Sequence, residues 1–173
     1  SPGELRLQEE GKGTYLSEYA NFAAALTEGK ILLLADLRGF GETTDPAFYT
    51  DAKYWNREYR NAMVSMHIGR PIMGQRVVDI LTLLDFCSEH EILKGHPVKV
   101  FAYGIYGPVA IHAAYLDERI NSVEIKHSVK TWKEYIERPM QWDMYSNVLY
   151  GALKYYDLPD LIRLSNCPIR FAD

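Results

Sequence analysis

The 173-residue sequence lacks two features that would assign a function class at once. It has no basic excess, since its formal net charge is −4, so no field that attracts nucleic acid is expected. It has no apolar run near the roughly 18 residues that span a membrane. Its hydrophobic fraction of 47% is ordinary for a globular protein. We therefore expect one domain with a real core and with neither nucleic acid nor a membrane as partner.

Metal and cofactor patterns are also missing. Cys87 and Cys167 are isolated and lack C-x-x-C spacing, which favours two buried free thiols over a disulfide or a site. No histidine pair has the spacing of a zinc site, and the sequence has no G-x-G-x-x-G dinucleotide fingerprint. The sequence thus predicts no metal and no cofactor.

Strand patterns alternate with helix patterns along the chain. Apolar runs bounded by glycine, proline or polar residues predict strands at 30–37, 98–103, 122–126 and 168–172. Helical spacing and caps predict helices at 17–28, 54–67, 75–90, 108–117, 131–137 and 143–156. Residues 1–15 show little periodicity and are expected to be an irregular lead-in. This order predicts an α/β fold, with a doubly wound, mostly parallel sheet flanked by helices.

The most informative stretch runs from Val98 to Leu116. It predicts a buried strand, a sharp turn at Gly104 and a helix of small residues with Pro108 in its first turn. Such a strand–elbow–helix unit carries the nucleophile in one large class of hydrolases. Yet no Ser, Cys, Asp or Glu lies between Lys99 and Leu116. The sequence predicts the scaffold and lacks the attacking group.

Four stretches together resemble the acetyl xylan esterase-like branch of the α/β-hydrolases. They are the loop Ala-Asp-Leu-Arg-Gly-Phe-Gly-Glu-Thr at 35–43, the helix region 69–81, the elbow with its continuation at 113–120, and 156–161. The resemblance covers roughly residues 17–173, and we expect 1–173 to be a single domain of this kind or a truncated segment of one. It implies a Ser-His-Asp triad that hydrolyses acyl esters on carbohydrate, in a soluble protein of secreted or periplasmic type.

The family's elbow motif, G-x-S-x-G-G, fits this sequence in two registers. Matching the small residue six positions after the serine to Ala110 places the nucleophile position at Gly104. Matching the motif as Gly104-x-Tyr106-x-Pro108 places it at Tyr106. We prefer the first register because it aligns the small residues of the helix. Neither supplies a serine; Asp173 comes a few positions too early for the acid, and the family's histidine would follow it.

Few residues around the elbow are candidates for chemistry. The Tyr106 phenol, with an ordinary pKa near 10, would need a strong base, so a packing tyrosine is favoured. Gly104 relieves the strain of an elbow with positive φ. The turn at Ile105 and Gly107 could still donate backbone N–H groups to an oxyanion. His127 follows the third predicted strand, at the end where α/β sheets place ligands, and is a weak catalytic candidate.

Other polar residues are expected to be structural. His112 lies between apolar residues on the elbow helix, which favours a core or interface histidine. Asp36 and Arg38 close the first predicted strand, and in this superfamily such an arginine ties its loop to neighbouring elements. Asp79 is expected on a solvated helix edge, and Asp85 in a contact at the helix end.

Three aromatic residues suggest a ligand surface. Trp132, Trp142 and Tyr145 could form the floor under a sugar ring, and they suit a cover over the sheet equally well.

We therefore expect a hydrolase-like domain without serine-esterase activity. The alternatives are a non-catalytic module that binds carbohydrate or protein, and a part of an active carboxylic-ester hydrolase whose catalytic residues lie elsewhere. Expected partners are an acylated polysaccharide or a second copy bound through an open sheet edge.

Overall fold

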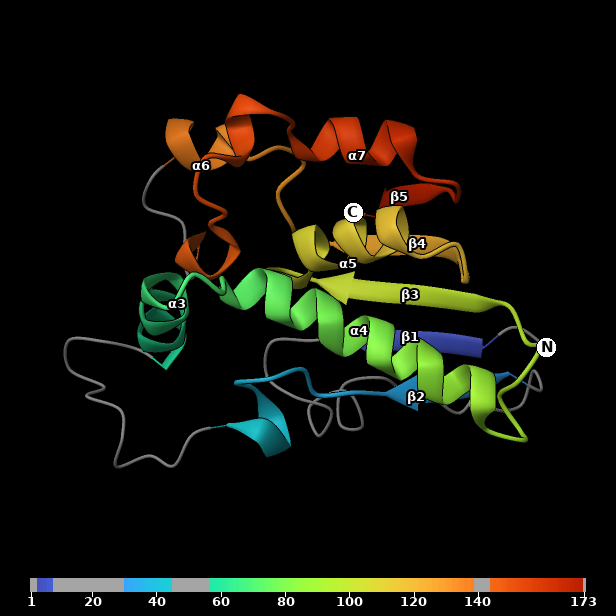
Figure 1. The fold of residues 1–173 in the computed structure, drawn as a ribbon. Coiled ribbons are helices and arrows are strands. Elements are labelled where there is room, and N and C mark those ends of the chain that lie inside the picture. Colours follow the sequence, from blue (N-terminus) through green and yellow to red (C-terminus); the bar gives the residue numbers. More distant parts are fainter. Residues whose placement is uncertain (1–2, 8–29, 45–56, 139–143, 173) are drawn as a thin grey trace.

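The computed structural model describes residues 3–7, 30–44, 57–138 and 144–172. Five strands form one sheet in the order β2-β1-β3-β4-β5, and every neighbouring pair is parallel (Figure 1). The strands are β1 Gly3–Leu7, β2 Ile31–Leu34, β3 Val98–Tyr103, β4 Ile120–Lys126 and β5 Ile169–Ala172. The predicted α/β fold with a parallel sheet is confirmed, as are the four predicted strands, within a few residues at their ends.

The first strand was not predicted. Residues 3–7 lie within the expected irregular lead-in, but they form β1, which pairs with β2 on one side and β3 on the other. The segment alternates leucine with charged residues, as a strand can, but it is too short for this alternation to be distinctive. Backbone pairing with β2 and β3 stabilises this strand, and such pairing with distant segments is not visible in the sequence of the strand itself.

Helices follow the predicted pattern in most of the described chain. They are α3 Arg57–His67, α4 Ile72–Glu89, α5 Tyr106–Leu116, α6 Lys133–Glu137 and α7 Leu158–Leu164. Short 3-10 turns are η1 Gly41–Thr43, η3 Met144–Asn147 and η4 Ala152–Lys154. The helices predicted near 54–67, 75–90, 108–117 and 131–137 are confirmed. The helix predicted at 17–28 lies outside the described residues.

The prediction of one helix over 143–156 is wrong. Two 3-10 turns occupy that region, and Gly151 between them has φ of 78°, a left-handed conformation that ends helical propagation. The helix α7 beyond it was missed. Asp157 caps α7 by accepting a hydrogen bond from the Leu158 N–H (2.7 Å), and Asp160 closes a capping box. In the sequence, Asp157 followed three residues later by Asp160 indicates the start of this helix.

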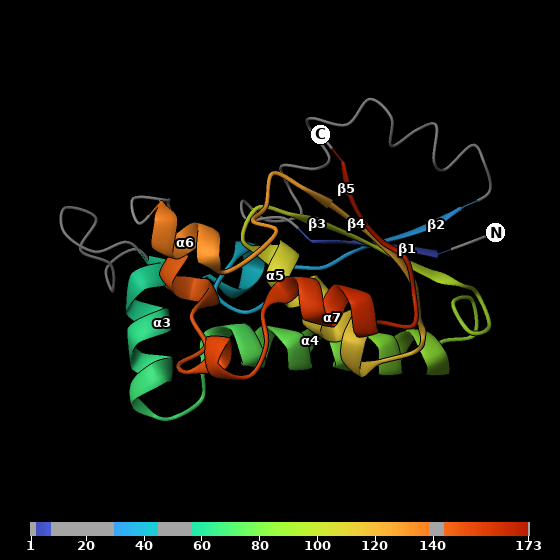
Figure 2. The same ribbon diagram turned by 90° about the horizontal axis from the view of Figure 1, so that it is seen from above.

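The described helices α4, α5 and α7 lie on one face of the sheet (Figure 2). The connections from β2 to β3, β3 to β4 and β4 to β5 all cross the sheet in the same direction. Right-handed crossovers in one direction place their helices on the same face. The connection from β1 to β2 runs the opposite way, through residues 8–29 outside the described chain, and the doubly wound arrangement depends on it.

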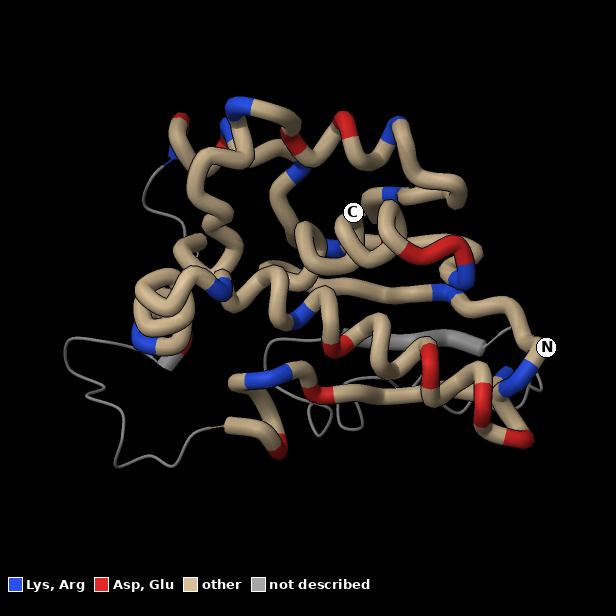
Figure 3. The backbone as a smooth tube through the Cα atoms, in the orientation of Figure 1, with Lys and Arg blue, Asp and Glu red and all other residues tan. Residues whose placement is uncertain are grey.

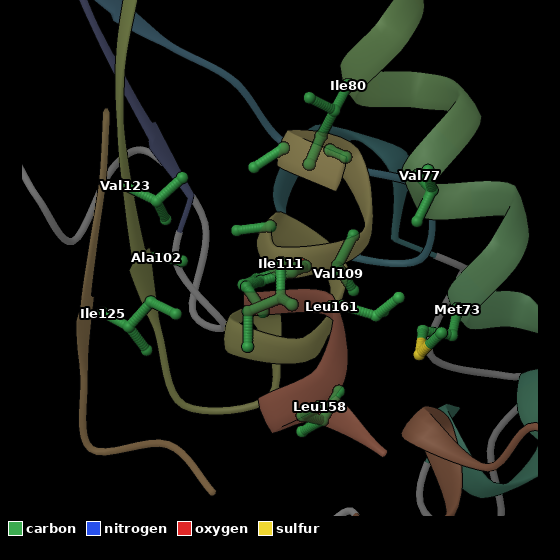
Figure 4. Packing of buried hydrophobic residues seen from close by; sticks show 14 of the residues in the cluster. Met73, Val77, Ile80, Ala102, Val109, Ile111, Val123, Ile125, Leu158 and Leu161 are labelled. Atoms are coloured by element: carbon green, nitrogen blue, oxygen red, sulfur yellow. The ribbon is translucent and has the colours of Figure 1, made fainter. Parts of the chain in front are cut away.

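The core forms where α5 packs between α4 and α7 and against β3 and β4 (Figure 4). Val109 and Ile111 of α5, Ile80 of α4 and Ile125 of β4 have no exposed surface. Nearly every side chain of α5 is buried, and its alanines allow this close approach. The helix that follows the elbow is therefore buried along nearly its whole length.

Charged residues of both signs are distributed over the helices and loops (Figure 3). No helix among the described residues has the length and apolar character needed to cross a membrane.

Candidate functional site

The turn after β3 lies at the point where the strand order reverses. From β1 the chain continues to β2 on one side, then returns to β3 on the other side of β1. In parallel α/β sheets, ligands bind outside the carboxyl ends of the strands at such a switch point. The topology therefore places the elbow where an α/β fold usually builds its site.

Gly104 is the apex of this turn. Its φ of 55° lies in the left-handed region, Ile105 follows at φ −64° and ψ −14°, and α5 begins at the next residue. The Gly104 N–H donates to the Lys126 carbonyl at 2.9 Å, which fixes the turn to the end of β4. The nucleophile in this type of turn occupies a sharp, strained position between strand and helix. The geometry thus agrees with the register that aligns Gly104 with the nucleophile.

Tyr106 is unsuited to be the nucleophile. It lies in the first turn of α5, and only 1% of its surface is exposed. Its ring meets the Phe40 ring edge-on, with centroids 5.5 Å apart. This burial favours the packing role of Tyr106 and disfavours the register that places the nucleophile at this residue.

Ile105 and Gly107, the two residues predicted to donate backbone N–H groups to an oxyanion, lie in different parts of the turn. The Gly107 N–H donates to the Gly104 carbonyl at 3.2 Å within the turn. The oxyanion role of Gly107 stays a prediction that this bond does not favour. Ile105 directly follows the apex, which is the position whose N–H contributes to the oxyanion hole in α/β-hydrolases. Its side chain is buried. The oxyanion role of Ile105 stays a prediction that rests on this position in the turn.

Gly107 has a packing role that the sequence did not reveal. A Cβ atom built on it would lie 2.1 Å from Ser128 Oγ and 2.7 Å from Ser128 Cβ. Ser128 comes just after β4, and its buried hydroxyl has no hydrogen-bond partner among the described residues. Only glycine lets the start of α5 approach this serine so closely.

A buried ion pair lies next to the first residue of α5, which follows the elbow turn. Arg76 of α4 and Glu58 of α3 form two hydrogen bonds, at 2.8 and 2.7 Å, with side chains only 1% and 5% exposed. The Arg76 guanidinium lies 4.7 Å from the Phe40 ring centroid and 5.8 Å from that of Tyr106, and it also donates to the Arg38 carbonyl. Sequence analysis missed this hub, although Arg76 lies on the apolar face of α4.

The loop after β2 is tied down as predicted. Arg38 donates to the Asp79 carboxylate through Nε (2.8 Å) and Nη2, and to Gln75 at 2.6 Å. Asp79 is therefore a partner of Arg38, and its expected place on a solvated edge is wrong. Asp36 accepts from the Glu42 N–H at 3.1 Å. The expected structural roles of Asp36 and Arg38 agree with these bonds.

His127 lies at the same end of the sheet as the elbow. It is exposed, with φ of 51°, and its ring contacts the Tyr103 ring at a tilt of 53°, with centroids 4.9 Å apart. Tyr103 ends β3 and His127 follows β4, so the two rings lie at the carboxyl ends of neighbouring strands. The pair is an aromatic surface beside the elbow.

His112 is a core histidine, as expected. It accepts a bond from the Tyr156 hydroxyl at 3.0 Å, and its Nδ1 lies 2.6 Å from the Pro108 carbonyl. A carbonyl oxygen can only accept, so Nδ1 carries the proton and Nε2 is the acceptor. Burial lowers the pKa of His112, and the bond to Pro108 opposes this shift. The imidazole is thus engaged in α5 packing.

The predicted aromatic floor is divided. Trp132 is 6% exposed and lies among the core rings of His112 and Tyr156, each with centroids 5.5 Å from its own. Tyr145 contacts Tyr59 edge-on at 5.3 Å. Trp142 lies outside the described residues. Burial of Trp132 favours the core role, one of the two that the sequence left open.

Both cysteines are free thiols, half-buried rather than fully buried, and burial raises the pKa of each. Asp85 pairs with Arg119 at 2.8 Å, in line with its expected helix-end contact. Within the described ranges, no group of three or more His, Cys, Asp or Glu side chains could hold a metal ion.

Comparison with family models and with curated proteins gave no match. Solved structures do match. A Bacteroides fragilis protein assigned as an acetyl xylan esterase has a TM-score of 0.75 at 16% identity, covering 99% of this chain. Acetyl xylan esterase 1 from Thermoanaerobacterium sp. has a TM-score of 0.59 at 13% identity over 99% of this chain. An esterase from Pyrococcus furiosus has a TM-score of 0.61 at 13% identity, covering 98% of this chain.

This chain spans 51%, 58% and 60% of the lengths of those three proteins, respectively. Identities this low carry the fold and not the activity. The likenesses extend over nearly all of the present chain, and they agree with the parallel sheet and the elbow described above. The chain therefore shares the α/β fold of these esterase structures.

Proposed function

We propose that this chain is a non-catalytic carbohydrate-binding domain built on an esterase fold, without serine-esterase activity. The observation that carries the proposal is Gly104, with φ of 55°, at the apex of the turn where the nucleophile stands in this fold. A glycine offers no oxygen or sulfur for attack. Because the residues of a triad act as a unit, loss of the nucleophile alone removes most serine-type catalysis.

The ligand we propose is an acylated polysaccharide, bound at the carboxyl end of the sheet. Two of the similar structures are named as acetyl xylan esterases, which supports this substrate class. The ring pair of half-buried Tyr103 and exposed His127 also supports it, because an accessible aromatic surface beside the switch point suits the apolar face of a sugar ring.

A second candidate function is a part of an active carboxylic-ester hydrolase. It is favoured by one observation, that the similar structures are longer than this chain, which spans 51% to 60% of them. In this case the described domain would supply the sheet and the α5 scaffold, and the catalytic residues would lie outside the 173 residues.

The test combines hydrolysis and binding measurements on the full chain. With p-nitrophenyl acetate we expect the rate in buffer alone. Calorimetric titration should give saturable binding to acetylated xylo-oligosaccharides and weaker binding to the deacetylated ones. Tyr103→Leu should weaken this binding about tenfold, equivalent to about 1.4 kcal/mol of lost ring contact. Tyr150→Leu, at a residue that is 94% exposed in the turn before η4, should leave it unchanged.

Turnover above buffer would contradict the non-catalytic part of the proposal. Absence of binding to every xylo-oligosaccharide would contradict the carbohydrate part, and would direct attention to a protein partner.

A further inference from the structure

A pocket of about 200 Å³ lies between α6, η3 and η4, away from the elbow. Its walls are mainly apolar and include Ile136, Met144, Leu149 and Leu153. No residue of the elbow turn lines it. The volume suits a ligand with one ring, since a cavity of about 150 Å³ is known to hold benzene.

Two buried polar atoms belong to residues that line this pocket. The Trp132 indole Nε1 and the Asn147 Oδ1 have no hydrogen-bond partner among the described residues. The two side chains are 6% and 0% exposed. The other atom of the Asn147 amide donates to the Tyr135 hydroxyl at 3.1 Å, so the amide group is held in place. Unpartnered polar groups this deeply buried are uncommon and call for an explanation.

We propose that this pocket binds a small neutral amide that carries an apolar ring or chain. The indole N–H would donate to the amide carbonyl of the ligand, and the ligand N–H would donate to Asn147 Oδ1. Each unpartnered atom would then gain the group that it lacks. None of the lining residues is charged, which disfavours carboxylate and ammonium ligands because a buried charge needs a counter-charge.

Access depends on the rim of the pocket. Both polar atoms are closed to solvent in this structure, so a ligand reaches them only when neighbouring side chains move. Ile136 and Leu153 are 68% and 43% exposed and also line the pocket. Exposed side chains change rotamer within picoseconds to nanoseconds, so such a movement needs no backbone rearrangement. The site is independent of any chemistry at Gly104.

The probe for this site is acetanilide, an apolar ring with a secondary amide. The full chain, labelled with ¹⁵N, is titrated while the Trp132 indole N–H signal is followed by NMR and assigned with Trp132→Phe. We expect a saturable downfield shift of this signal. Acetophenone has the ring and the carbonyl but no N–H, and we expect it to bind about fivefold more weakly, the effect of one lost hydrogen bond.

Two variants test the assignment. Asn147→Leu should weaken the binding of acetanilide about fivefold, so that the chain no longer prefers acetanilide over acetophenone. Leu153→Phe keeps both polar groups and fills the pocket from its exposed rim, so it should abolish the shift even if Asn147→Leu fails to fold. Tyr155→Phe, at a side chain 87% exposed and outside the pocket lining, is the matched control and should bind as the original chain does.

Equal affinity for acetanilide and acetophenone would overturn the proposed amide recognition, and an unshifted Trp132 signal would overturn the site. Neither result bears on carbohydrate binding at Tyr103 and His127, so this proposal and the proposed function fail separately.

Discussion

At the scale of single residues, two glycines determine what the elbow can and cannot do. Gly104 takes the left-handed backbone conformation, which costs other residues about 1–2 kcal/mol, and leaves the apex without a side chain. Gly107 allows α5 to lie against Ser128. Gly104 thus bears on function and Gly107 on packing, and separate substitutions test the two roles.

Gly107→Ala should lower the free energy of unfolding by about 1–3 kcal/mol, measured by urea denaturation. The new Cβ would lie 2.1 Å from Ser128 Oγ, and this overpacking exceeds the gain of about 1 kcal/mol that alanine brings in a helix. Adding Ser128→Gly removes both clashing atoms and should restore part of the loss.

The matched control is Gly74→Ala in α4, where the added Cβ meets no atom within 4 Å and should leave stability equal or slightly higher. Equal effects of the two alanine substitutions would contradict the close contact at Ser128.

His112 makes stability depend on pH. Burial lowers its pKa from the ordinary value of about 6.5, so the folded state favours neutral imidazole while the unfolded state takes up a proton more readily. Its contribution is complete above pH 6.5 and is lost as the pH falls from there toward the folded-state value. Urea denaturation between pH 8 and pH 5 should show this slope, and His112→Gln should reduce it. An unchanged slope in the variant would assign the pH dependence to other groups.

At the scale of elements, the carboxyl edge is held together by contacts between α3, α4 and α5. The buried pair of Arg76 and Glu58 joins α4 to α3, and the Arg76 guanidinium lies against Tyr106 at the start of α5. Arg38 joins the loop after β2 to α4 through Asp79. These contacts join the elements around the turn at Gly104 to one another.

Glu58→Ala should destabilise the chain by about 3–5 kcal/mol, because it leaves the Arg76 charge buried without its carboxylate partner. Thermal or urea denaturation measures the effect. Asp85→Ala is the control, since the Asp85 side chain is 65% exposed and its pair with Arg119 should contribute less than about 1 kcal/mol. A loss below 1 kcal/mol for Glu58→Ala would show that the buried pair is dispensable.

At the scale of the whole molecule, the alternation of strands and helices was readable from the sequence. Apolar runs such as 98–103, in which Val100 and Ala102 are buried and the other residues half-buried, carry a strong signal for a strand. The sequence signal for strand β1 is weak, because the place of this strand between β2 and β3 comes from pairing with segments distant in sequence. The break at Gly151 and the cap at Asp157 are local features, which glycine and the Asp157/Asp160 spacing indicate in the sequence.

The site could be predicted only in part, for the same reason. The turn at Gly104 follows from local sequence, and the structure agrees with it. The contact of Gly107 with Ser128 and the hub at Arg76 join residues far apart in the chain, which no local pattern reports. Self-association through a sheet edge remains a prediction that gel filtration would test.

The central claim is that the elbow presents no side-chain nucleophile, and covalent labelling tests it most directly. The full chain is incubated with a fluorophosphonate, which reacts with activated serine hydroxyls, and intact mass spectrometry then measures any adduct. We predict an unmodified mass at a probe concentration that labels an active serine esterase completely. A stoichiometric adduct, located by peptide mapping to a serine of this chain, would contradict the account.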